Sequence, residues 1–395
     1  MKHVDKLLFI LALAVLVTAI IRFGVNRDPA PRTKTPAIVF TQWWEDYIEK
    51  EPLQDLVKEF QDTHGRINVI LNRISYEDLY RELLGAEGEK TVPGDLFTLD
   101  VLWAPELMKR ETMDFAWANS VGPQSPDTPI VSFINVLFYN VEILKEAGFS
   151  RPPKSRSEFI NMARAVSGAL GWALGSSRGI YDDVFPWIWA AGAELVKDGK
   201  PALNSRAVVE SLSFLASLEN NGFIAPGGFS AGAEKKLADF ISGRTAFMIA
   251  PSRDIEFVRK HMGEQAFGVT DVPAPDNYAG KTFYAAAGWT LGINPASAHR
   301  EEARLFAEFI AGKAQALSEI VMSGNRVQDP FHSKVWDIGM AGESARDFTG
   351  LPWEKLEEVF NEELSILFAG QASPAETASA IQKRWEAVIS SYGSN

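Results

Sequence analysis

The chain of 395 residues contains no cysteine, which excludes disulfides, zinc–thiolate sites, iron–sulfur clusters, thiol nucleophiles and lipid attachment through an N-terminal cysteine. It also lacks a basic excess. The formal net charge is −12, so a nucleic-acid partner is not expected, because such binding needs a positive surface that neutralises phosphates. The five histidines are scattered without metal-ligand spacing, and no metal site is expected.

The sequence motifs do not indicate a catalytic activity. Neither a Walker loop nor an H-E-x-x-H metal helix occurs in the sequence. The 51 acidic side chains would form pairs by chance, so the carboxylate pair of a glycosidase cannot be inferred from them. We therefore expect a protein that is not an enzyme and that holds no cofactor and no catalytic residue.

Apolar and aromatic residues are plentiful. The composition is 46% hydrophobic and includes eleven tryptophans, enough for a large core. The length exceeds that of one ordinary domain, so two domains are expected.

The first residues have the pattern of an export signal. Lys2 and Lys6 precede an uncharged apolar run over residues 7–21, which favours an extracytoplasmic location. Two outcomes stay open: cleavage near Ala19, or retention of residues 1–25 as an anchor of nearly the ~20 residues that span a bilayer. We favour the anchor because no clear A-x-A cleavage site follows the run. The segment 26–36, with three prolines, is expected to be an extended linker.

The segments that follow alternate between strand and helix patterns. Strands are expected at 37–44, 67–74 and 95–103, with helices at 49–65 and 75–86 between them. Ser75 stands as an N-cap with Asp78 three residues later. This alternation predicts an α/β fold with a parallel sheet covered by helices.

The second half has longer helices. Further strands are expected at 130–140, 245–250, 267–275 and 287–294. Helices are expected at 205–222, over 299–322 and at the C-terminus, where Ser373 caps the last one. No repeat of fixed period occurs.

Several blocks in collinear order resemble one known family. They include FTQWWED, PGDLFTLDVLWAPEL, PWIWAAGAEL, GRTAFMIAPSRD and GWTLGINPASAHREEARLFAEFI, spread over most of residues 37–395. In this order they resemble the extracellular solute-binding proteins of ABC importers, specifically the carbohydrate-binding group related to maltose-binding proteins.

The resemblance implies a type II periplasmic-binding-protein-like α/β fold, in which two lobes with mixed, mostly parallel sheets are joined by hinge strands. It implies crossovers near 132–135, 269–272 and 323–324. The first lobe would then hold residues 37–133 and 271–322, and the second lobe residues 134–270 and 323–395. Ligands favour such domain interfaces, and a few residues at element ends can act as hinges.

The resemblance implies a monomer that captures a sugar or sugar-like ligand and delivers it to the permease subunits of an importer. One departure is the segment 109–129, which is shorter than usual and lacks the family's Gly-Lys-x-Tyr-x-x-Pro hairpin, so one wall of the cleft is expected to be reduced. This leaves an alternative: a sensor or interaction protein on the same fold that has lost or altered transport.

A sugar site needs aromatic rings that stack on C–H faces, together with polar groups that bond the hydroxyls. Residues of these kinds near strand ends, or at positions that the family uses, are the candidates. The expected ligand-binding residues are Trp43, Trp44, Glu45, Asp100, Trp103, Asp182, Asp183, Trp187, Ser252, Arg253, Gly288, Trp289 and Arg326.

Several candidates also have a structural alternative. Trp43 or Trp44 could fill the core, and Asp100 could cap the next helix. Trp187 and Trp189 cannot share a helix face, so one of them is expected in the core. Trp289 is the strongest candidate, because the Gly-Trp pair at 288–289 matches a site position of the family. At 252–253 polar side chains stand where the family often has a tryptophan.

Overall fold

The computed structural model describes residues 36–48, 50–84, 93–115, 117–118, 129–166, 168–323, 329–345, 348 and 350–393. The expected anchor and nearly all of the linker lie outside these residues, as does Arg326. None of the helices formed by the described residues combines the length and the apolar composition that a membrane span requires.

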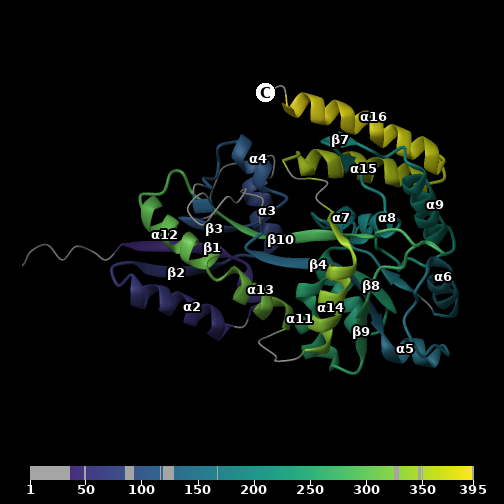
Figure 1. The fold of residues 1–395 in the computed structure, drawn as a ribbon, viewed down its shortest axis with the longest axis horizontal. Coiled ribbons are helices and arrows are strands. Elements are labelled where there is room, and N and C mark those ends of the chain that lie inside the picture. The colour runs from purple at the N-terminus through teal and green to yellow at the C-terminus, as the bar shows by residue number, and fades with distance from the viewer. Residues whose placement is uncertain are drawn as a thin grey trace, which may run out of the picture.

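One mixed sheet runs through the whole molecule (Figure 1), and its strand order is β2-β1-β3-β10-β4-β8-β5. The strands at the N-terminal side pair in parallel, and β10 pairs antiparallel with both β3 and β4, so it joins the two halves. The bounds are β1 Ala37–Gln42, β2 Asn68–Arg73, β3 Leu96–Asp100, β4 Val131–Asn140, β5 Leu170–Gly171, β8 Phe247–Pro251, β9 Phe267–Thr270 and β10 Phe283–Ile293.

Helices gather around each half of the sheet. We call the half with β1, β2 and β3 the first lobe. It carries α2 (Lys50–Thr63), α3 (Tyr76–Leu84), α4 (Ala104–Lys109) and α12 (Arg300–Ala311), at the left of Figure 1.

The half with β5, β8 and β9 is the second lobe, at the right of Figure 1. Its main helices are α5 Val141–Glu146, α6 Arg156–Ala165, α7 Gly179–Asp183, α8 Phe185–Trp189, α9 Arg206–Asn220, α10 Ala233–Ile241, α11 Ile255–Met262, α14 Pro330–Ala341, α15 Trp353–Phe368 and α16 Pro374–Gly393. The expected α/β architecture with a mixed sheet is confirmed, although the sheet is continuous between the halves.

Two helix starts form as their sequences predict. The Asp78 amide donates to Ser75 Oγ at 3.1 Å at the start of α3. At the start of α16 the Glu376 amide donates to Ser373 Oγ, and the Ser373 amide donates to Glu376 Oε2 at 2.8 Å. These bonds satisfy amides that have no partner inside the helix.

The single helix expected over 299–322 is wrong. It is broken at Gly312, so that α12 ends at Ala311 and α13 (Ala314–Ser323) begins in a new direction. The break lets α12 pack on β10 in the first lobe, while α13 packs on β4 and α11. Glycine is a poor helix former, so Gly312 is a favourable place for the helix to end where the packing requires it.

The strands change partners near two of the three crossovers that the resemblance implies, and the third, near 323–324, extends into residues outside the described ones. β4 pairs with β10 up to Ile134, with β8 from Asn135 onwards and with β9 from Leu137 onwards. β9 ends at Thr270, where the chain leaves the sheet. Few residues therefore connect the lobes at these points, and their role as hinges remains a prediction.

Candidate functional site

Three tryptophans of the first lobe lie together where the carboxyl ends of β1 and β3 meet. Trp43 follows β1 and Trp103 follows β3, and their ring centroids are 5.4 Å apart. Trp289 lies on β10 opposite Asp100 and is 6.1 Å from Trp43. Trp44 stacks on Trp289 at 6.0 Å. The parallel pairing of β1 and β3 brings these side chains to one edge of the sheet.

All four rings are buried, with exposures of 0–1%. Their indole N–H groups have no acceptor among the described residues, whereas Trp117 and Trp385 donate to backbone carbonyls. A buried indole N–H normally has a partner. Trp172, Trp187 and Trp353 in the second lobe are unpaired as well, so unpaired indoles alone do not single out this cluster.

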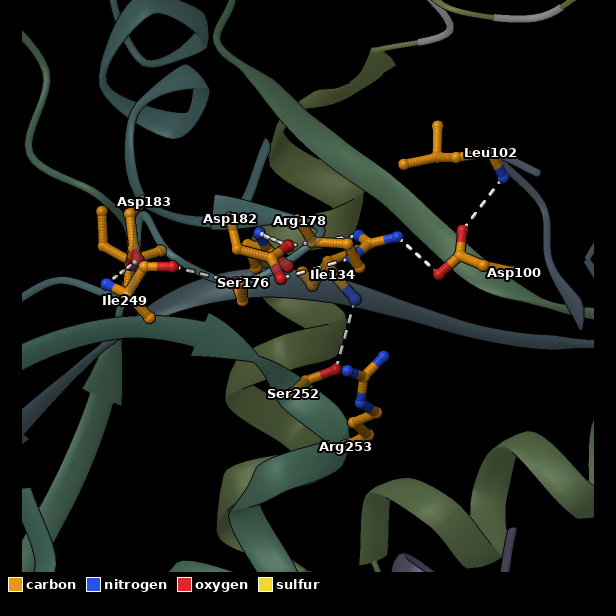
Figure 2. A network of polar contacts seen from close by, with 12 residues as sticks. Asp100, Leu102, Ile134, Ser176, Arg178, Asp182, Asp183, Ile249, Ser252 and Arg253 are labelled. Atoms are coloured by element: carbon orange, nitrogen blue, oxygen red, sulfur yellow. Dashed lines mark hydrogen bonds and ion pairs between the residues drawn. The ribbon is translucent and has the colours of Figure 1, made fainter. Parts of the chain in front are cut away.

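A buried ion network joins the two lobes beside this cluster. Arg178, just before α7 in the second lobe, donates from Nη1 to Asp100 Oδ2 at 2.6 Å, and its Nη2 lies 3.1 Å from Asp182 Oδ1. Figure 2 shows Arg178 reaching between the two carboxylates. Tyr76 Oη donates to Asp100 Oδ2 at 3.0 Å, and the Leu102 amide donates to Asp100 Oδ1 at 2.9 Å.

The network determines which of its side chains are charged at neutral pH. Burial favours the neutral form of Asp182, but the neighbouring Arg178 outweighs it and lowers the pKa of Asp182 below its ordinary value. Burial raises the pKa of Tyr76 well above 10, helped by the negative charge of Asp100. Asp182 is therefore charged and Tyr76 is a neutral donor. Asn135 Nδ2 also donates to Asp182 Oδ1, at 2.9 Å.

Arg253 enters the same region from the second lobe, after β8. Its guanidinium lies over the rings of Phe133, Tyr47 and Trp289, at 4.4, 4.9 and 5.6 Å from their centroids. Such placement over aromatic faces is favourable for a cation. The Nε and Nη1 groups of Arg253 are buried and have no hydrogen-bond partner among the described residues. Burial raises the pKa of Tyr47 to about 12, so its hydroxyl is neutral.

Ser252 has a different role from its neighbour. Its Oγ accepts a hydrogen bond from the Ile134 amide at 3.3 Å and so ties β8 to the crossover on β4 (Figure 2). Gly288 is required by packing, since a Cβ there would lie 2.3 Å from the Val131 carbonyl oxygen on the paired strand. Ser252 therefore acts through its hydroxyl, and Gly288 through its lack of a side chain.

The lobes also touch at the rim of the site. The Ser177 Oγ donates to Glu77 Oε1 on α3 at 3.2 Å. Arg110 after α4 lies 3.5 Å from Glu354 on α15. On α16, Tyr392 Oη donates to a carbonyl oxygen of α4 at 3.1 Å. The described structure therefore has its lobes closed on each other.

Some expected residues lie away from this region. Asp183 pairs with Lys236 at 2.7 Å and accepts from the Ala173 amide, inside the second lobe, and burial raises its pKa to about 6. Trp187 packs against Phe159 and Phe214 in the same lobe. The sequence had placed both with the ligand, but the turns of α7 and α8 point them into the lobe interior.

Glu45 lies beside the cluster, but its carboxylate accepts a hydrogen bond from Gln42 Nε2 at 3.1 Å. Trp189 is a core residue, as is Trp187, so both tryptophans fill the core where one was expected to. Arg326 lies outside the described residues.

Arg178, Tyr76 and Asn135 were missed by sequence reasoning. Arg178 had a signal, because it is the only cation between Arg164 and Lys197 and it precedes Asp182 by one helical turn. Tyr76 and Asn135 had none, since their roles depend on contacts across 24 and 47 residues.

Two sequence matches to the G-x-S-x-G nucleophile elbow, at 175–179 and 228–232, need a structural test. That elbow places its serine on a tight turn between a strand and a helix. Ser177 lies in the turn between β5 and α7, but its Oγ donates to Glu77 Oε1 of the other lobe, and Ser230 Oγ bonds the Gly227 carbonyl in a surface turn. Within the described part of the chain, no group of three His, Asp or Glu side chains is arranged to hold a metal ion.

Comparison with known proteins identifies a related sequence, similar structures and a matching family. A curated relative from Deinococcus radiodurans, a probable ABC transporter-binding protein, is 24% identical over 263 residues, which cover 59% of this chain and 61% of the relative. The chain thus spans less than two thirds of that relative's length.

Solved structures share the fold. A solute-binding protein from Thermotoga lettingae, bound with α-D-tagatose, superposes with a TM-score of 0.74 at 16% identity, covering 90% of this chain and 100% of that one. The GacH receptor of Streptomyces glaucescens, solved unliganded and with acarbose, gives 0.69 at 20% identity, covering 90% and 98%. A ribitol complex from Agrobacterium radiobacter gives 0.67 at 18% identity, covering 89% and 98%.

The family model described as bacterial extracellular solute-binding protein matches residues 45–317, well over half of the chain, and includes Trp103 and Trp289 of the cluster. The chain belongs to the bacterial extracellular solute-binding protein family.

Proposed function

We propose that this protein captures a sugar or sugar-like solute between its two lobes and delivers it to the permease subunits of an ABC importer. The observation that carries the proposal is the junction of the lobes, where the Trp43–Trp103–Trp289 cluster adjoins the Asp100–Arg178–Asp182 network. Tagatose, acarbose and ribitol in structures of the same fold support a hydroxyl-rich ligand.

The residues at the junction suit such a ligand. Indole faces stack on apolar C–H surfaces, while carboxylates and guanidinium groups bond hydroxyl rims. Arg253 has donors to offer, and Asp100 and Asp182 have acceptor capacity beyond their present bonds. Because the rings are buried against each other, entry of a solute requires the lobes to separate.

Closure follows from differential affinity. In the open form a solute meets the side chains of one lobe, and closing adds those of the other lobe. The solute shifts the population only by the contacts that it gains on closing. Arg178 and Arg253 come from the second lobe and meet groups of the first, so they supply the contacts that exist only when the lobes are closed.

A second candidate is a sensor or interaction protein that does not transport. The observation in its favour is that side chains of the protein itself occupy the junction: Arg178 links the lobes and Arg253 fills the space over Tyr47, Phe133 and Trp289. In that case the closed form needs no solute.

A screen separates the two candidates. The full-length protein is tested by thermal shift against sugars and polyols, beside Arg253→Gln. The control is Arg259→Gln, a buried arginine over Phe331 that pairs with Asp329, inside the second lobe. Transport predicts a solute that raises the melting temperature of the wild type and the control but not of Arg253→Gln. No response to any solute favours the second candidate.

We also propose that the protein is a monomer and acts outside the cytoplasm, held to the membrane by residues 1–25. The family description supports the extracytoplasmic location, and the pattern of Lys2, Lys6 and the apolar run supports the anchor. We infer that it has no enzymatic activity, which incubation with oligosaccharides would test by the absence of turnover.

A further inference from the structure

A cavity lies at the hinge, apart from the tryptophan cluster. It has a volume of about 360 Å³ and lies between α8, residues 270–274, the start of β10 and α14. It opens where β4 changes partners, since β10 pairs with β4 up to Ile134 and β9 pairs with it only from Leu137. The volume is within the range of small-molecule sites, which starts at about 300 Å³.

One residue of the lining carries an unsatisfied acceptor. Asn135 lines it, is 4% exposed, and has an Oδ1 without a hydrogen-bond partner among the described residues. The Nδ2 of the same amide is committed to Asp182 Oδ1, at 2.9 Å, so that bond fixes which way the amide faces. Leaving a buried acceptor unpaired is unfavourable, and an occupant with an O–H or N–H group would satisfy it.

Two cations line the same cavity. Lys154 lies before α6 and Lys334 lies on α14, and neither forms an ion pair with another described residue. Asp271 is the one carboxylate of the lining. Apolar surface from Pro186, Phe283 and other residues completes the walls. The lining is therefore complementary to a molecule that combines an anionic group, a hydrogen-bond donor and a short carbon skeleton.

We propose that this hinge cavity binds a small hydroxylated anion, such as a sugar acid or a polyol phosphate of three to six carbons. Lys154 and Lys334 hold its anionic group, and Asn135 Oδ1 accepts from one of its hydroxyls. The site is separate from the one between the lobes, whose polar groups are Asp100, Arg178, Asp182 and Arg253.

An occupant of the cavity would also influence closure. Asn135 contacts Asp182, which pairs with Arg178, which pairs with Asp100 of the other lobe. A molecule bound at Asn135 therefore acts on the chain of contacts that holds the lobes together. This coupling rests on the proposed function, whereas the site itself does not. Coupling of this kind is reciprocal between the two ligands.

The experiment is calorimetric titration of the full-length protein with D-gluconate and glycerol 3-phosphate, beside glucose, glycerol and inorganic phosphate, which each carry only one of the two features. The test variant is Lys154→Met with Lys334→Met. The matched control is Lys145→Met with Lys383→Met, two exposed lysines outside the cavity.

We expect at least one hydroxylated anion to bind the wild type and the control equally, at least tenfold more tightly than the single-feature compounds, and to lose tenfold or more in the test variant. Binding that Arg253→Gln abolishes and the test variant keeps would place the anion between the lobes and overturn the proposal. No binding of either anion would overturn it as well. The proposed function fails separately, by the absence of any sugar response.

Discussion

The contact between Asp100 and Arg178 gives the sharpest prediction, because it crosses from one lobe to the other with both side chains buried. Substitution Asp100→Asn removes the charge of Asp100 but keeps an oxygen for the Leu102 amide. Arg178 keeps its second partner, Asp182, at 3.1 Å. The change therefore weakens one link between the lobes without leaving the guanidinium alone.

The size of the effect follows from this remaining pair. Removing one partner of a buried ion pair costs about 3–5 kcal/mol when the other charge is left uncompensated. Here the amide nitrogen replaces Oδ2, which accepts from Arg178 and from Tyr76 of the same lobe. The loss between the lobes is the charged hydrogen bond from Arg178, about 1.5–3 kcal/mol. Since the link exists only when the lobes are closed, this corresponds to a shift of about 10- to 150-fold toward separated lobes.

The absence of cysteine makes the measurement direct. Cysteines introduced at Met108 on α4 and Lys383 on α16 label one exposed position on each side of the junction, and electron paramagnetic resonance gives the distribution of distances between the labels. Asp100→Asn is expected to add a population with longer distances.

Asp183→Asn is the matched control. It breaks the pair with Lys236, which is equally buried but lies within the second lobe. It is expected to lower the melting temperature and to leave the distances unchanged. Identical distributions for Asp100→Asn and the wild type would refute the claim that this ion pair holds the lobes together.

Three more outcomes are expected. Trp289→Ala should cost about 3–5 kcal/mol in unfolding free energy because its ring is fully buried, and about 1–3 kcal/mol in sugar binding if the ring stacks; unchanged affinity in calorimetry contradicts the stacking. Burial raises the pKa of Asp183 from 3.8 to about 6, so the folded state binds the extra proton in this window. The free energy of unfolding should therefore fall as pH rises from about 4 to 6, by at most about 1.4 kcal/mol per pH unit. Urea unfolding of Asp183→Asn at several pH values should show a weaker dependence of this free energy on pH. The native protein should stay in the membrane fraction at high salt, whereas release as a shorter soluble form indicates cleavage.

Local signals in the sequence predicted most of the fold. The hydroxyls of Ser75 and Ser373 begin their helices as expected, because a cap depends on residues within one turn. The break at Gly312 had a local signal, because glycine often follows the last residue of a helix. The different packing partners of α12 and α13 had none, because they depend on contacts with distant parts of the sheet.

The candidate site was predicted in part, for the same reason. Trp43, Trp103, Trp289 and Asp100 come together because strand ends in an α/β sheet meet at one edge. Asp183 could not be distinguished from Asp182 in the sequence, since adjacent residues of a short helix point in different directions and only one of them reaches Arg178.

The capture of a solute between the lobes is tested most directly by calorimetric titration of the wild type, Arg253→Gln and Arg259→Gln with the solutes that respond in the screen. Arg253 is the cation of the second lobe that lies over Tyr47 and Trp289 of the first, and its Nε and Nη1 have no hydrogen-bond partner among the described residues. A sugar or polyol that binds the wild type and Arg259→Gln alike, and binds Arg253→Gln at least tenfold more weakly, is the predicted result. Equal affinity for all three proteins, or no binding by any of them, would contradict it.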